Sequence, residues 1–174
     1  MAYDAFLKLD GIDGESTDHD HLGWIDVLSW SWGATQPGMK MAVGSGAGSG
    51  SRPSMQVLSI GKRIDSTSPL LFLRCVSGRP IPSMELDIVH GDSGEGALPL
   101  LQIKWTNVLV NSYTPSELLT ASSQSPVGLQ PDMVPVEYVG FNYAKIEFKS
   151  FQYKGGKLLN TVVSTYDLKS NKGA

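Results

Sequence analysis

The chain has 174 residues, enough for one well-buried core and short for two ordinary domains. Its net charge of −3, with 41% apolar and 18% charged residues, indicates a globular protein without the basic face that nucleic acid requires. No apolar stretch approaches a transmembrane helix, and the N-terminus lacks the features of a signal peptide. We therefore expect one domain over residues 1–174, folded in the cytoplasm, with no nucleic-acid partner and no membrane insertion.

Alternation of apolar and polar residues with a period of two predicts strands along most of the chain. Within residues 84–88, Met84, Leu86 and Ile88 share one face of a strand. The following strand is expected to place Leu101, Ile103, Trp105 and Leu109 on the core side. Further strands, rich in β-branched and aromatic residues, are expected over residues 3–9, 23–36, 53–64, 133–154 and 157–168. The pattern predicts an all-β, mainly antiparallel fold, with two sheets in a barrel-like sandwich.

The segment 133–154 is too long to keep a single phase of alternation. Its large apolar residues fall on odd, then even, then odd positions: Phe141 and Tyr143, Ile146 and Phe148, Phe151 and Tyr153. A change of phase by one residue is the signature of a β-bulge. Long, bent strands of this kind suit a barrel or a sharply coiled sandwich.

The first strands are separated by an acidic turn, in which Asp18, His19, Asp20 and His21 alternate. Two hypotheses remain for this run, a solvated turn and a metal site. The turn is favoured because the ligand spacings of an EF-hand and of a zincin are both absent.

The segment 28–33 separates large and small residues onto opposite faces. Leu28, Trp30 and Trp32 share one face, which we expect in the core because large rings gain most from burial. Ser29, Ser31 and Gly33 form a small, polar and flat opposite face. That face could meet bulk solvent, a neighbouring subunit or a wide channel, and the sequence does not choose among them.

One segment has the signals of a short α-helix. Ser68 is expected as its N-cap, Pro69 as its first residue and Gly78 as its stop. The residues between are apolar almost all round, apart from Arg74, so we expect a helix buried on most sides that plugs a barrel end or covers a sheet edge. Leu71 and Phe72 are expected in the core. The single cysteine, Cys75, is interpreted as a small buried hydrophobe.

A loop over residues 37–53 combines a Gly/Ser run with an apolar flank, residues 39–43. A mobile loop that exposes apolar residues is unusual in a monomer. We find no nucleophile elbow and no phosphate-binding loop, and His90 is interpreted as a strand-end residue beside a turn. The sequence therefore predicts neither catalytic residues, nor a metal site, nor a cofactor.

Three segments, taken in order, resemble one known family. The first is YDAFLKL at residues 3–9 with IDGES at 12–16, the second is IDVLSWSWG at 25–33, and the third is KRIDSTSPLL at 62–71, which runs on to CVSG at 75–78. With these blocks the chain resembles the haemolysin-coregulated protein family, Hcp, over its whole length and most strongly in its first half.

The resemblance implies two β-sheets with one short helix, assembled into a ring of six subunits with a wide central hole. Such homo-hexameric rings stack into the inner tube of the type VI secretion machine of Gram-negative bacteria, where sheath, spike and effector proteins are the partners. The tube protein is secreted without a cleaved signal peptide, carries effectors in its lumen and is not an enzyme.

Some residues of this chain match family positions. The resemblance implies that Ser31 faces the lumen and contacts cargo, although an exposed serine without a special role is the competing interpretation. Ring or stacking contacts are expected at Met39, Lys40, Met41 and Val43. Two alternatives stay open: a stand-alone barrel that binds a small ligand between Trp24, Trp30 and Trp32, and a hydrolase that uses His90 with a serine.

Overall fold

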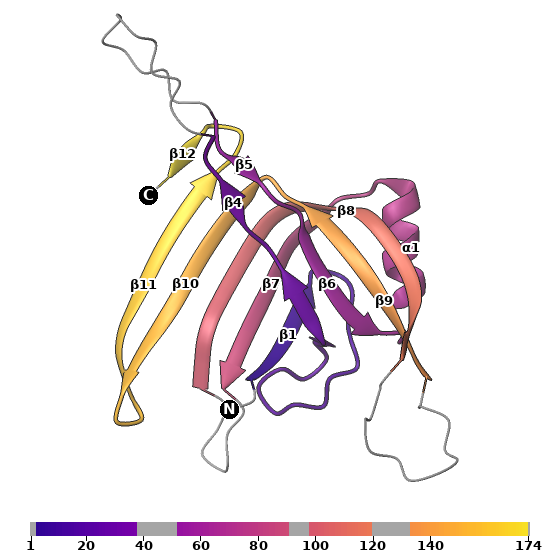
Figure 1. Cartoon of the computed structure of the whole chain (residues 1–174), viewed down its shortest axis with the longest axis horizontal. Coiled ribbons are helices and arrows are strands. Elements are labelled where there is room, and N and C mark those ends of the chain that lie inside the picture. The colour runs from indigo at the N-terminus through magenta and orange to yellow at the C-terminus, as the bar shows by residue number, and fades with distance from the viewer. Residues whose placement is uncertain (1–2, 38–51, 91–97, 120–132, 174) are drawn as a thin grey trace, which may run out of the picture.

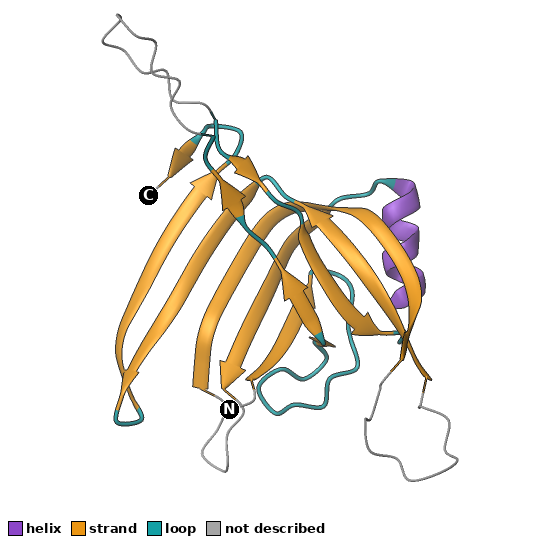
Figure 2. Cartoon of the chain, viewed as in Figure 1, coloured by secondary structure: helices purple, strands orange, loops and turns teal. Residues whose placement is uncertain are grey.

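The computed structural model describes residues 3–37, 52–90, 98–119 and 133–173 (Figure 1). The expected contact residues Met39, Lys40, Met41 and Val43 lie outside the described residues. Strands make up most of what is described, with a single helix (Figure 2). The elements are β1 (Tyr3–Leu9), β2 (Ile25–Asp26), β3 (Ser29–Ser31), β4 (Ala34–Thr35), β5 (Ser54–Met55), β6 (Leu58–Arg63), α1 (Ser68–Ser77), β7 (Ile81–His90), β8 (Leu98–Leu119), β9 (Met133–Asn142), β10 (Lys145–Lys154), β11 (Lys157–Asp167) and β12 (Lys172–Gly173).

All described strands except the separate pair β4–β5 form two layers that share β8. The first layer has the order β12-β11-β10-β8-β7-β1-β2, and the second layer has the order β3-β6-β9-β8. Every pairing is antiparallel. The predicted all-β fold of two sheets and one helix is confirmed. Among the described strands the path of hydrogen-bonded neighbours does not return on itself, so the fold is an open sandwich rather than a closed barrel.

The 22-residue strand β8 passes from one layer to the other near Asn107. Asn107 has a left-handed backbone conformation, with φ 55°. This interrupts the alternation, because Trp105 is buried before it and Val108 and Val110 are buried after it. The expectation that Leu109 lies in the core is therefore wrong: its side chain is 41% exposed.

Other long segments also divide where the phase of alternation changes. The predicted strand over residues 133–154 breaks between Asn142 and Lys145 into β9 and β10, and the register of β10 with β11 shifts again between Gln152 and Tyr153. The two predicted strands over residues 23–36 and 53–64 are likewise divided, into β2, β3 and β4 and into β5 and β6. The breaks between β2 and β3 and between β9 and β10 take the chain from one layer to the other, whereas the shift in β10 lies within the first layer.

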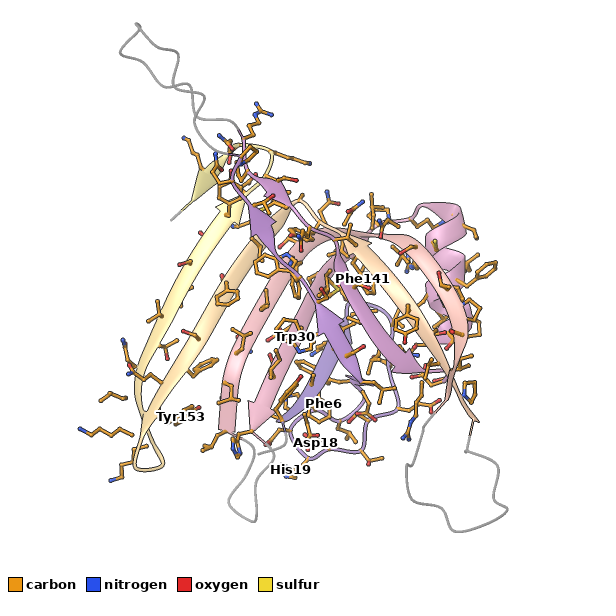
Figure 3. The ribbon with its side chains drawn as sticks, viewed as in Figure 1. Phe6, Asp18, His19, Trp30, Phe141 and Tyr153 are labelled. Carbon is orange, nitrogen blue, oxygen red and sulfur yellow. The ribbon has the colours of Figure 1, made fainter. Side chains whose placement is uncertain are left out.

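The core lies between the two layers, where Trp30 and Phe141 are seen in the middle of the molecule (Figure 3). Among the five side chains expected there, Leu71 is fully buried, and Trp30 and Trp32 are half-buried against the core. Leu28 and Phe72 are not core residues, because they are 50% and 51% exposed. Leu28 lies in the gap between β2 and β3, where the strand alternation does not apply, and its N–H donates to the carbonyl of Gly61 at 2.8 Å.

The helix α1 is only partly covered, contrary to expectation. Thr67 is its N-cap, one residue before the expected position. The stop at Gly78 is confirmed by its left-handed φ of 62° and its N–H bond to the carbonyl of Arg74. Ser68 and Leu71 are the buried residues of α1, which packs against β8 with one face and leaves most of its apolar side chains exposed.

Candidate functional site: a small-residue face, an apolar cleft and an exposed helix

Ser31 belongs to a row of small residues across the outer side of the second layer. Strand register pairs Ser31 with Ser59, Ser59 with Gly140, and Gly140 with Ser112. Directly paired residues point to the same side of a sheet. The three serines are exposed. We call this row, Ser31, Ser59, Gly140 and Ser112, the small-residue face.

Glycine is required within this face by close packing. A Cβ at Gly140 would lie 2.3 Å from Oγ of Ser112 and 2.6 Å from Oδ1 of Asn111. The register of β8 with β9 shifts between Val110 and Ser112, which brings Asn111 close to Gly140. The result is a low, polar surface with no bulky side chain at these four positions.

The opposite side of the same strand carries the tryptophans. Trp32 packs at ring-centroid distances of 6.4 Å from Trp105 and 6.0 Å from Phe148, and its Nε1 donates to the hydroxyl of Tyr143. The Tyr143 hydroxyl donates in turn to the carbonyl of Gln56 at 3.1 Å. Burial raises the pKa of Tyr143, while the hydrogen bond from Trp32 lowers it by less.

Trp24 does not join the other tryptophans. Its ring contacts the ring of His21, with the centroids 4.8 Å apart, and Nζ of Lys8 lies 5.5 Å from the Trp24 ring centroid. The structure therefore does not bring Trp24, Trp30 and Trp32 together around one pocket, as the ligand-binding alternative expected.

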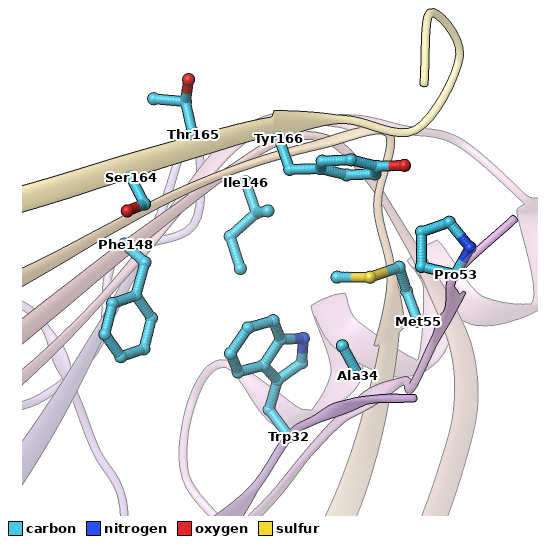
Figure 4. Close-up of a pocket in the computed structure, with 9 residues that line it drawn as sticks. All are labelled: Trp32, Ala34, Pro53, Met55, Ile146, Phe148, Ser164, Thr165 and Tyr166. Carbon is cyan, nitrogen blue, oxygen red and sulfur yellow. The ribbon is translucent and has the colours of Figure 1, made fainter. Parts of the chain in front are cut away.

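An apolar cleft of about 450 Å³ opens beside Trp32, between the β4–β5 pair and the β10–β11 pair (Figure 4). Its lining includes Trp32, Ala34, Met55, Ile146, Phe148 and Tyr166. No charged side chain is among the lining residues in the described part of the chain. The cleft is suited to apolar groups, since it offers few polar partners to orient a polar ligand.

A buried polar network holds the beginning of α1. Nζ of Lys62 lies 2.8 Å from Oε1 of Glu137 and 2.8 Å from Oδ1 of Asp65, and the side chains of Lys62 and Glu137 are fully buried. The hydroxyl of Tyr113 donates to Oε2 of Glu137 at 2.6 Å. Burial, followed by the bond to Glu137, raises the pKa of Tyr113 to about 12. The network fixes α1 against β6, β8 and β9.

The acidic turn is pinned to the first layer by His21. Nδ1 of His21 lies 2.7 Å from Oδ1 of Asp18, and Nε2 lies 3.3 Å from Oδ2 of Asp87 in β7. His21 is buried and stacks on Phe6 at 4.3 Å, whereas His19 is exposed and pairs with Asp20. The hydrogen bond from His21 lowers the pKa of Asp18. The turn is therefore tethered rather than fully solvated.

Within the described residues, no group of three or more His, Cys, Asp or Glu side chains is arranged to hold a metal ion. His90 ends β7 opposite Tyr3 of β1, at the strand-end position expected for it. Nor is any helix in the described ranges long and apolar enough to cross a membrane. The most prominent features of the described residues are the small-residue face, the apolar cleft and the exposed side of α1.

Comparison with known proteins gives these surfaces a family context. The family model of the type VI secretion system effector Hcp matches residues 6–150, and the chain belongs to this family. It is 42% identical over 114 residues to the protein hcp1 of Pseudomonas aeruginosa. The aligned stretch covers 66% of this chain and 68% of the relative.

Solved structures agree over the full length. A type six secretion system protein matches with a TM-score of 0.81 and 31% identity, over 99% of this chain and 100% of that one. The crystal structure of Hcp1 from Salmonella typhimurium matches with a TM-score of 0.75 and 32% identity, over the whole of both chains. The chain is therefore a protein of type VI secretion.

Proposed function

We propose that this chain is the structural subunit of a type VI secretion inner tube. Six copies form a ring, rings stack into a tube, and the tube is secreted. The observation that carries the proposal is the full-length likeness to Hcp structures, combined with family membership. The whole chain, residues 1–174, acts as one domain, uses no cofactor and has no enzymatic role.

Exposed apolar surfaces support assembly. The α1 side chains Leu70, Leu73 and Val76 and the β11 side chains Leu158, Leu159, Val162 and Val163 are all exposed. Monomeric proteins rarely expose several such groups together, because each loses free energy by contact with water. A ring would cover them. The sheath, the spike and stacked rings are the further partners of the tube.

The small-residue face is suited to line the lumen. Serine and glycine leave a smooth polar wall along which cargo can move without large apolar contacts. Ser31 is exposed on this face, and we propose that it contacts effectors carried in the tube.

The ring is tested by measuring the mass of the purified chain with light scattering and by viewing it in the electron microscope. We expect particles of six subunits with a central hole. A species that stays monomeric at micromolar concentration would contradict the proposal. If a small apolar ligand quenched the tryptophan fluorescence of that monomer, the ligand-binding alternative would replace the proposed function.

The role of Ser31 is tested with Ser31→Arg, using Thr17→Arg as the matched control on an exposed residue of the acidic turn. Ser31→Arg should keep the ring and weaken the retention of effector, as measured by co-purification. Thr17→Arg should change neither. Loss of the ring in Ser31→Arg alone would place Ser31 at a subunit contact instead.

A further inference from the structure

We infer that His21 is a proton-dependent latch: with a proton on both ring nitrogens it holds the acidic turn against the first layer, and loss of one proton releases the turn. The acidic turn joins β1 to β2 over residues 10–24. The side chains of the latch are His21, Asp18 and Asp87. All three belong to one chain, so the latch does not depend on the proposed ring.

Both ring nitrogens of His21 face carboxylates. Nδ1 lies 2.7 Å from Oδ1 of Asp18 in the turn, and Nε2 lies 3.3 Å from Oδ2 of Asp87 in β7. An ionised carboxylate only accepts hydrogen bonds, so both contacts are hydrogen bonds only when both nitrogens carry a proton. A neutral imidazole has a single N–H and would turn a lone pair toward one of the carboxylates. The arrangement is therefore that of an imidazolium between two carboxylates.

The latch is buried, so water does not readily replace a lost hydrogen bond. His21 is 5% exposed and stacks on Phe6, which is 8% exposed. Within the described residues, Oδ1 of Asp87 is buried without a hydrogen-bond partner, and Oδ2 faces His21. Loss of the Nε2 proton would leave the Asp87 carboxylate against a lone pair. A buried charge without a partner is strongly unfavourable, so the contact between the turn and β7 would open.

The charged groups around His21 favour its protonated form. They are carboxylates from three elements and two lysines: Asp18 on the turn, Asp87 on β7, Asp4 and Asp26 in a cavity beside Phe6, Lys8 over the ring of Trp24, and Lys149 in β10, across Gln102 from Asp87. Asp18 and Asp87 together carry more charge than one imidazolium. Loss of the His21 proton therefore leaves two negative charges with no positive charge between them, which destabilises the latched turn.

Asp18 keeps its charge over the range in which histidine titrates. The side-chain hydrogen bond from His21 is the largest of the causes that lower the pKa of Asp18. The backbone N–H groups of Asp20 and His21 also donate to its Oδ1, at 3.1 and 3.0 Å. A carboxyl group with a lowered pKa stays ionised above about pH 4 and loses its contribution only in stronger acid. Between about pH 5 and pH 8, the charge of the latch therefore changes at the histidine.

The acidic turn can move as a unit. A cavity of about 430 Å³ is lined by Ser16, Thr17 and Asp18 of the turn and by residues of β1 and β2, Phe6 among them. Open space, rather than close packing, thus adjoins the latch, which lies near the edge of the molecule (Figure 3). Within the turn, the N–H of Gly14 donates to the carbonyl of Gly23 at 2.7 Å. Internal bonds of this kind keep the turn together when its contact with the sheet opens.

A rise in pH favours the released turn. The conformation that binds the additional proton is favoured at low pH and loses population as the pH rises. Release would uncover Phe6. It would also move Glu15, whose Oε1 accepts a hydrogen bond from the N–H of Ser66 at 3.0 Å, just before α1. The protonation of His21 is thereby coupled to the residues that lead into α1.

Hydrogen–deuterium exchange of the full chain tests the latch. Exchange is followed by mass spectrometry in peptides from the acidic turn, from about pH 5 to pH 8, relative to the unfolded chain at the same pH. Protection of the turn should fall roughly tenfold or more as the pH rises, the factor expected for one hydrogen bond to a charged group. In Asp87→Asn the fall should vanish. An amide can accept from an imidazolium or donate to a neutral ring, so it keeps the bond in both states.

Three further variants separate His21 from the other histidines. The chain has three histidines, so His19→Gln and His90→Gln are the matched controls. His19 is exposed, and the hydrogen bond with Asp20 raises its pKa, so its titration must be told apart from that of the latch. Both controls should keep the full pH dependence. His21→Phe keeps an aromatic ring over Phe6 without either hydrogen bond, and it should show the low protection of the released turn at every pH.

Each outcome decides for or against the latch. Protection of the acidic turn that does not change with pH in the original chain would overturn it. So would a fall that persists undiminished in Asp87→Asn, since the carboxylate would then play no part. Loss of the pH dependence in His19→Gln or His90→Gln would assign the effect to another histidine. High protection of the turn in His21→Phe would show that packing alone holds it.

Discussion

The small-residue face and the outer side of α1, which carries Leu70, Phe72, Leu73 and Val76, are both exposed on this subunit, but they differ in chemistry. The first carries Ser31, Ser59 and Ser112 around Gly140, whereas the second carries leucine, phenylalanine and valine side chains. Water solvates serine hydroxyls well, so the first face gains little from being covered. Apolar area gains roughly 25 cal/mol per Å² when it leaves water, so the second gains much. Exposure alone does not mark a contact surface, but exposure of large apolar groups does.

The same difference extends to what lies beneath each face. Under the small-residue face are apolar core residues such as Ile60 and Val139, while a buried charged network lies beside α1. A charged network has directional bonds that hold a helix in one position, whereas an apolar core is held by close packing without directional bonds. The exposed apolar side of α1 therefore lies beside the described region's buried Lys62–Glu137 pair, which fixes the start of the helix.

The largest effect on stability should come from breaking the buried network of Lys62, Glu137 and Asp65, which we call the α1 anchor. Lys62→Met leaves the carboxylate of Glu137 buried without its partner, and such losses cost about 3–5 kcal/mol. We expect the free energy of unfolding to fall by that amount in urea denaturation. The double variant Lys62→Met/Glu137→Met should recover most of the loss, because the fully buried carboxylate is removed with its partner, and Asp65 still accepts from the N–H and the hydroxyl of Thr67. A single variant as stable as the original chain would show that the network does not anchor α1.

A smaller loss is expected when the small-residue face is overfilled. Gly140→Val places a side chain where Oγ of Ser112 would be 2.3 Å away, and overpacking of this kind costs about 1–3 kcal/mol. Ser59→Val is the control on an exposed neighbour in the same row, and its effect should stay within about 0.5 kcal/mol. Equal stability of the two variants, measured by thermal unfolding, would show that the packing at Gly140 is loose.

The third prediction uses pH to weaken the α1 anchor without changing its shape. The pKa of Tyr113 is raised from 10.0 to about 12 by burial first and by the bond to Glu137 second. A phenol whose pKa is raised by folding stabilises the fold fully below pH 10. That contribution is lost as the pH rises from 10 toward 12. Tyr113→Phe should therefore lose less stability than the original chain over this range, in denaturant titrations at each pH. A parallel loss in both would contradict this account.

The smallest effect is expected at Leu28, next to the small-residue face. Because Leu28 is half exposed, Leu28→Ala should change the free energy of unfolding by no more than about 0.5 kcal/mol. The matched control, Leu71→Ala on the buried side of α1, should cost about 2–5 kcal/mol. A large loss at Leu28 in the monomer would mean that this leucine is packed after all.

Alternation was a good guide where the chain stays within one layer. It located β7 and placed Ile103 and Trp105 in the core, while β-branched and aromatic composition located β1 and β11. It failed where the chain changes layer, at Leu109 after the left-handed Asn107 and at Leu28 between two short strands, because local alternation carries no record of such a break. The helix signals at Pro69 and Gly78 were equally local and were confirmed within one residue at the N-cap.

Part of the buried charge network could also be found from local pattern. Lys62 shares the phase of Leu58 and Ile60, and Glu137 shares that of Val139 and Phe141, so both charges could have been expected to point inward. The pairing of Lys62 with Glu137 could not be predicted, because the two residues lie 75 residues apart in the chain. For the same reason, an apolar helix such as α1 could not be divided in advance into a buried and an exposed side.

The sequence by itself determined the all-β class, the single helix, the small polar face around Ser31 and the resemblance to Hcp. These depend on periodicity and on short motifs, which are properties of neighbouring residues. Only the tertiary structure decided that Phe72 faces outward, that His21 and Lys62 are buried against distant carboxylates, and that a cleft opens beside Trp32. These depend on which strands meet across the layers, and burial is a property of that arrangement rather than of any one segment.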